Sequence, residues 1–143
     1  MLLSVRDLYY RIFEENITEI TREDENIALA AIVAAESEAR MYLSRYDTTA
    51  LFGPEGGEPS FRDPLLMSIC LDIAIWKLVQ VGRPAINYQM ARDAYDIAVR
   101  QLRDIQQLRA DPAGWPYRDT TGQTAPQGST VSAAYNAKRE NDF

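Results

Sequence analysis

The sequence predicts an all-α protein, a small four-helix bundle with a long extended C-terminal tail. Three observations carry this prediction. The stretch 63–81 is apolar on nearly every side, its neighbours are apolar on one side only, and the composition turns polar after residue 114. A segment that is apolar all round must be wrapped by the rest of the chain. With 143 residues, one domain of ordinary size is expected. We therefore expect a helical bundle domain over 1–114 and an extended tail that docks on a partner over 115–143.

The middle element of this bundle is the apolar stretch itself, DPLLMSICLDIAIWKLVQV. It is too long for an ordinary strand, and Asp63 followed by Pro64 supplies an N-cap and a first-turn proline. Gly82 stands where a left-handed C-cap residue is wanted. We expect a buried helix that ends at this glycine.

The charges in this helix are Asp72 and Lys77. The chain has no other long apolar run, so a membrane-spanning role is not expected. Because burying a lone charge is costly, Asp72 is expected either to pair with Arg40 or Arg45, or to lie where the bundle surface opens.

The chain begins with a shorter helix. Ser4 and Asp7 have the spacing of a capping box, with Asp in place of the usual Glu or Gln, and the helix is expected to end near Asn16. Residues 17–20 are interpreted as a connector.

The second helix is expected over 22–45, capped by Thr21 and Asp24. Glu36 and Arg40 fit an exposed i,i+4 pair. The apolar positions recur at steps of four and three, and the many alanines among them favour close packing on the middle helix. This stripe comprises Ala28, Ile32, Ala35, Ala39, Tyr42 and Tyr46.

Residues 47–62 break the helical pattern, because the glycines and prolines of 53–59 cannot continue a helix. A loop of this length is a candidate contact element. The last helix is expected over 87–109. Its charged residues are interpreted as a solvated face, and its inward face is expected to comprise Met90, Ala94, Ile97, Ala98, Ile105 and Leu108.

The C-terminal part divides into an aromatic anchor (115–117), a polar spacer (119–132) and a final segment with aromatic and basic side chains (133–143). Residues 115–117 form a compact aromatic anchor that we expect to fold back on the bundle. Residues 119–132 have a disordered composition, and the chain then ends in aromatic and basic side chains. We expect the tail to bind a partner, and the candidate partner-binding residues are Trp115, Tyr117, Tyr135, Asn136, Lys138, Arg139, Asn141 and Phe143.

Composition bears on the class of function. The chain has no histidine, one cysteine and a formal net charge of −6, and it carries neither a phosphate-binding glycine loop nor carboxylates at metal-ligand spacing. We expect no enzyme, no cofactor and no metal, with Cys70 as a small core residue in a reducing compartment. The acidity is concentrated in residues 1–60 (net −7, against +1 for the remainder). That balance disfavours tight binding of nucleic acid.

A resemblance adds to this interpretation. The stretch AESEARMYLSRYD (35–47), a Gly/Pro loop, CLDIAIWKL (70–78) and YDIAVRQL (95–102) together resemble the small helical head-to-tail connector proteins of tailed phages. These proteins are also called adaptor or head-completion proteins, and the likeness is strongest to the Mu-like group. The ending YNAKRENDF is similar to tails of versions from phages or prophages of Bacteroides-type hosts.

Membership of that family would imply a structural virion protein in the neck, assembled in the host cytoplasm, without a membrane. Its partners would be the portal protein, tail or further neck proteins, and copies of itself in a ring, commonly of twelve. DNA would pass through the lumen without specific binding. We expect acidic side chains of residues 14–38 to line that lumen, and the tail to bind a neighbouring protein, first of all the portal.

Two other classes of function stay open. A helix-turn-helix DNA-binding regulator would use the first two helices, although the acidic start of the second helix would then face phosphate. A scaffold or chaperone-like bundle outside any virion fits the composition equally well.

Overall fold

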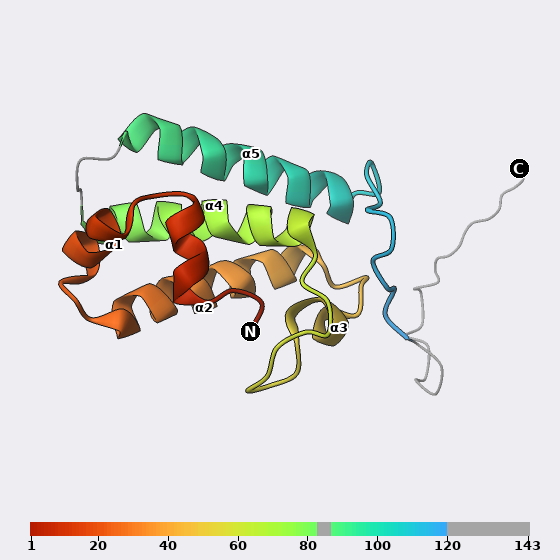
Figure 1. Ribbon diagram of the computed structural model, residues 1–143. Coiled ribbons are helices and arrows are strands. Elements are labelled where there is room, and N and C mark those ends of the chain that lie inside the picture. Colours follow the sequence, from red (N-terminus) through yellow and green to blue (C-terminus); the bar gives the residue numbers. More distant parts are fainter. Residues whose placement is uncertain (83–86, 120–143) are drawn as a thin grey trace, which may run out of the picture.

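The computed structural model describes residues 1–82 and 87–119, and the all-α prediction is confirmed (Figure 1). In this part of the chain the extended pairing is limited to one isolated bridge, between Tyr46 and Tyr117. Three long helices build the bundle and three short ones cover its ends. In chain order they are η1 (Val5–Tyr10, a 3₁₀ helix), α1 (Glu14–Thr21), α2 (Glu25–Tyr42), α3 (Thr48–Phe52), α4 (Pro64–Val81) and α5 (Tyr88–Gln106).

Helix α4 is the centre of the core, as predicted, and it packs against both α2 and α5. The Asp63 side chain caps it by accepting a hydrogen bond from the Leu66 amide at 3.0 Å. Cys70 is fully buried, so its prediction as a core residue is confirmed. By length and composition α4 could also cross a membrane, but more than half of it is buried inside the bundle.

The predicted left-handed cap at Gly82 is wrong. Its backbone is extended, with φ −150° and ψ 158°, and makes no left-handed turn. A Cβ atom at Gly82 would lie 3.6 Å from the Cα of Ile20, which is ordinary van der Waals contact. Gly82 therefore packs against the end of α1, and neither a left-handed backbone nor a clash requires a glycine there.

Helix α2 packs on α4 through the predicted alanine stripe. Ala28, Ile32, Ala35 and Ala39 are all buried. The N-cap is Asp24, which accepts a hydrogen bond from the Asn26 amide at 3.0 Å, so the helix begins three residues later than expected. It also ends earlier, at Tyr42.

The N-terminal segment forms two helices, η1 and α1, where one helix and a connector were predicted. The capping box at Ser4 and Asp7 is confirmed, but it opens a 3₁₀ helix that ends at Tyr10. Residues 17–20, expected as a connector, belong to α1, where Ile17 and Ile20 face the core. Helix α1 then ends at a left-handed Arg22 with φ 54°, a helix end that no glycine marks in the sequence.

The predicted loop 47–62 contains a helix. Asp47 caps α3 by accepting a hydrogen bond from the Ala50 amide at 3.0 Å, and Leu51 and Phe52 are buried. The true loop starts at Gly53, whose φ of +95° and close neighbours exclude a side chain. A Cβ atom there would lie 2.7 Å from the Glu58 carbonyl carbon.

Helix α5 presents a different face to the core from the one predicted. Ala98 and Ile105 are buried as expected, together with Ala91 and Leu102. Three residues predicted to face inward are instead largely exposed: Met90 (68%), Ile97 (48%) and Leu108 (63%). The buried face is therefore turned away from Met90 and Ile97, and Leu108 lies beyond the end of the helix.

Candidate partner-binding surface

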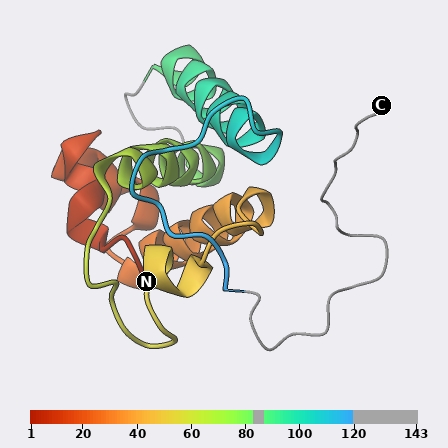
Figure 2. The ribbon, with the colours of Figure 1, turned by 90° about the vertical axis from the view of Figure 1, so that its right-hand side faces the viewer.

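An aromatic cluster holds the segment after α5 against the end of α2. The Tyr46 ring stacks on the Tyr117 ring, with 5.3 Å between centroids and 14° between planes. Trp115 meets the same Tyr46 ring edge-on at 5.5 Å and is only 5% exposed. Figure 2 looks onto this end of the bundle, where the segment passes from α5 down to α3. We call Tyr46, Asp111, Trp115 and Tyr117 the C-terminal anchor.

Asp111 joins the two tyrosines of the anchor. Tyr46 donates its hydroxyl hydrogen to one carboxylate oxygen at 2.8 Å, and Tyr117 donates to the other. These hydrogen bonds, first that from Tyr117, lower the pKa of Asp111. Burial, reinforced by the bond to Asp111, raises the pKa of Tyr46 to about 12. Both tyrosines are therefore neutral donors and Asp111 an ionised acceptor at neutral pH.

Backbone contacts complete the attachment of this segment. The Asp47 amide donates to the Pro116 carbonyl at 2.9 Å, and the Arg118 amide donates to the Arg45 carbonyl at 2.9 Å. The Arg45 side chain donates to the carbonyl oxygens of Ile105 (3.3 Å) and Gln106 (3.1 Å) at the end of α5. One arginine thus ties the end of α2 to the end of α5 and fixes where the chain leaves the bundle.

The predicted partner-binding residues are placed as follows. Trp115 lies inside its own bundle, which confirms the expected fold-back of the anchor and leaves little of its ring for a partner. Tyr117 is 54% exposed and offers one face of its ring. The other six, Tyr135, Asn136, Lys138, Arg139, Asn141 and Phe143, lie outside the described residues, as does the polar spacer from residue 120.

A second surface, which the sequence interpretation missed, lies at the opposite end of the bundle. A cavity of about 460 Å³ opens between η1, the start of α1, α4 and the start of α5. Tyr10 (77% exposed), Phe13 (76%) and Met90 (68%) surround it. We call it the η1–α5 cavity. The signal was present in Met90 and Ala94 of α5, which line the cavity and which the prediction had turned toward the core.

Asp72 lies at this cavity, and its partner is not the one predicted. Arg11, and neither Arg40 nor Arg45, donates to its carboxylate at 3.0 Å. Arg11 also donates to the Ser68 hydroxyl at 2.6 Å. Burial raises the pKa of Asp72, and the Arg11 guanidinium opposes that rise. The carboxylate lies at a partly open surface, so pairing and partial exposure both occur.

The other charge of α4 is paired across the bundle. Lys77 lies 2.9 Å from a carboxylate oxygen of Glu38 on α2, and Tyr95 on α5 donates its hydroxyl to the same carboxylate at 2.8 Å. Three helices therefore meet at Glu38. This contact fixes their relative rotation more than it adds stability, because the groups are partly solvated.

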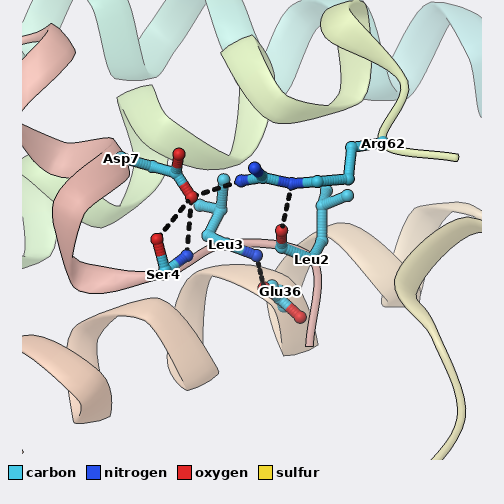
Figure 3. A network of polar contacts seen from close by, with 6 residues as sticks. All are labelled: Leu2, Leu3, Ser4, Asp7, Glu36 and Arg62. Carbon is cyan, nitrogen blue, oxygen red and sulfur yellow. Dashed lines mark hydrogen bonds and ion pairs between the residues drawn. The ribbon is translucent and has the colours of Figure 1, made fainter. Parts of the chain in front are cut away.

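A polar network holds the first residues of the chain (Figure 3). The predicted exposed pair of Glu36 with Arg40 is wrong, because Glu36 is only 2% exposed. Its carboxylate accepts a hydrogen bond from the Leu3 amide at 2.8 Å. Arg62 donates to the Leu2 carbonyl at 3.1 Å and pairs with Asp7. The N-terminal segment, which leads into η1, is thus fixed to α2 through Glu36 and to the end of the loop through Arg62.

The groups at these two surfaces offer packing, hydrogen bonding and charge. In residues 1–82 and 87–119, no group of three or more His, Cys, Asp or Glu side chains is placed to hold a metal ion. Burial raises the pKa of the Cys70 thiol, which keeps it protonated and unreactive. The class that fold and surface define is a small all-α bundle with an anchored C-terminal segment. No protein-family model, curated protein or solved structure matches the chain.

Proposed function

We propose that the chain is a structural subunit of a phage neck, a head-to-tail connector that forms a ring between portal and tail through which DNA passes. The resemblance of 35–47 and 70–78 to connector proteins suggests this role. The observation that carries it is the C-terminal anchor. It holds residues 115–118 at one end of the bundle, so the tail starts from a fixed point and can bind a neighbouring protein of the ring or the portal.

The acidic half of the chain supports a conduit for DNA. Of the acids within 14–38, Glu36 is buried and Glu38 pairs with Lys77, so neither is available to a lumen. The exposed ones gather on α1 and at the start of α2: Glu14, Glu15, Glu19, Glu23, Asp24 and Glu25. We propose that this end faces the lumen, where like charge keeps DNA from binding tightly.

The test is assembly with a portal protein. The full chain and a chain ending at Arg118 are each mixed with portal and examined by pull-down and negative-stain electron microscopy. The account expects rings on portal with the full chain only, while both chains unfold at the same temperature. A truncated chain that still assembles would place the docking surface on the bundle or on the loop 53–59. A full chain that never joins portal would favour a scaffold bundle instead.

A separate measurement is needed to show which residues line the lumen. In an assembled ring, Glu19→Lys together with Glu23→Lys should slow DNA passage or retain DNA, because Lys side chains bind phosphate. Asp93→Lys on α5 is the matched control for added charge. A ring whose lumen is lined by Arg92, Arg100 and Arg103 would contradict the proposal.

A further inference from the structure

The η1–α5 cavity is a mainly apolar hollow, lined also by the Arg11–Asp72 ion pair, and it has no cover among the described residues. Its volume of about 460 Å³ is within the range of pockets that bind small ligands or side chains. The rings of Tyr10 and Phe13 stand at its edge more than three-quarters exposed. Apolar groups gathered in this way mark a docking site rather than ordinary surface.

The chain itself contains a segment whose composition is complementary to this cavity. Residues 133–143, beyond the described part, carry Tyr135 and Phe143 as large apolar side chains and Lys138 with Arg139 as adjacent cations. The cavity offers aromatic walls, and directly after Phe13 the first turn of α1 exposes Glu14 and Glu15. Aromatic side chains and a basic pair thus match an apolar hollow beside two carboxylates.

The anchor and the cavity lie at opposite ends of the bundle. Figure 1 shows the segment after α5 at one end, with α1 and the start of α5 at the other. Helix α5 has 19 residues and is therefore about 28 Å long. A tail that returned to its own cavity would have to run back along that helix, past the charged side chains of Arg100, Arg103 and Asp104.

The spacer between Arg118 and Tyr135 has roughly sixteen residues and can span about 53 Å when extended, so it also reaches a neighbouring copy without following its own helix. We propose that residues 133–143 of one copy occupy the η1–α5 cavity of a second copy. Each copy then donates a tail at one end and accepts one at the other. Such heterologous contacts generate rings, or filaments if they do not close.

This proposal does not require the virion role. It concerns contacts between copies of this chain, whereas the connector function concerns the portal. Association of the purified chain would survive even if portal binding failed, so the two can fail separately.

The first test is the association of the full chain, measured by sedimentation velocity over a range of concentrations. Phe143→Ser in the tail and Phe13→Ser in the cavity should each weaken association about tenfold or more. Phe13 occupies the N-cap of α1, a position that serine favours, so this change should not unfold the helix. Phe61→Ser is the matched control, since Phe61 is 69% exposed and lies away from the cavity lining. It should change nothing.

The second test mixes the two defective chains. A chain with Phe143→Ser keeps its cavity, and a chain with Phe13→Ser keeps its tail, so a mixture should form pairs that cannot grow further. Each variant alone should associate about tenfold or more weakly than the mixture. Two outcomes would overturn the proposal: association that survives Phe143→Ser, which would mean that bundle faces cover the cavity, and a monomeric wild-type chain at every concentration, which would leave the cavity to its own tail or to another protein.

Discussion

The two ends of the bundle use aromatic side chains in opposite ways. At the C-terminal anchor, Trp115 is buried and both Tyr46 and Tyr117 have ring and hydroxyl partners within the chain. At the η1–α5 cavity, Tyr10 and Phe13 are mostly exposed around a hollow. One end is closed by the chain's own residues, and the other is open.

This difference separates stability from binding. An aromatic side chain that is packed on several sides holds the fold together, whereas one that is exposed beside a cavity contributes little until something covers it. The anchor therefore determines where the tail begins, and the cavity is where a partner can bind. Variants at the two ends should affect different measurements.

The largest contrast is expected from removing one aromatic ring at each end. Trp115→Ala deletes a buried side chain and should lower the free energy of unfolding by about 3–5 kcal/mol. Phe13→Ala removes an exposed ring and should change it by no more than about 0.5 kcal/mol. Urea denaturation of both variants measures the difference. Equal losses would show that the cavity end is also part of the core.

A smaller effect is expected at the network that holds the first residues of the chain. Glu36→Ala leaves the buried Leu3 amide without its acceptor and should cost about 1–3 kcal/mol. Glu36→Gln keeps an acceptor oxygen and is the matched control. Hydrogen exchange should show faster exchange over residues 2–12 in the alanine variant only. Unchanged exchange there would mean that Arg62 alone holds the N-terminal segment.

The smallest effects are expected in the pH dependence of stability. The pKa of Asp111 lies below its ordinary value of 3.8, so its contribution is present above about pH 4 and is lost as the pH falls through the folded-state pKa. Asp111→Asn should make the loss of stability on acidification smaller. Thermal melts between about pH 2.5 and 6 would record it. An unchanged curve would show that the tyrosine contacts do not depend on the charge.

The contribution of Asp72, at the open end, to stability should change with pH in the opposite direction. The pKa of Asp72 is raised, so the folded state binds its proton more tightly, and stability grows as the pH falls through the folded-state pKa toward 3.8. Asp72→Asn should remove that gain in the same melts. A loss of stability on acidification at this site would mean that the Arg11 pair outweighs burial.

The sequence was sufficient where one local signal determines the structure of a segment. Asp63–Pro64 before a long apolar run predicted α4 correctly, and the aromatic group at 115–117 predicted the fold-back. It was insufficient where a residue's burial or ion pair depends on a partner far away in the sequence. The burial of Glu36 depends on the Leu3 amide, 33 residues away, and Asp72 meets Arg11 from a segment expected to be one continuous helix.

The inward face of α5 shows a second limit. Its apolar side chains spread over more of the helix surface than α4 covers, and periodicity alone cannot tell which of them α4 will bury. Of the face chosen from the sequence, Ala98 and Ile105 are buried, whereas Met90 and Ile97 are exposed and Met90 borders the cavity. The candidate docking site was therefore visible in the sequence as apolar residues, but only the packing of α4 against α5 shows that they are free to bind.

The most direct test of the open end is a cross-link between copies. A chain with Asn16→Cys in the cavity lining and Asp142→Cys in the tail keeps Tyr10, Phe13 and Phe143. It is prepared in light and heavy isotope forms, mixed in equal amounts after partial denaturation and refolding, and oxidised. Cys70 is buried and should not compete. The account predicts a disulfide between positions 16 and 142, with about half of the linked peptide pairs combining one light and one heavy partner, as head-to-tail contacts require. Linked pairs that are always of one isotope would show that each tail fills its own cavity, and would contradict the account.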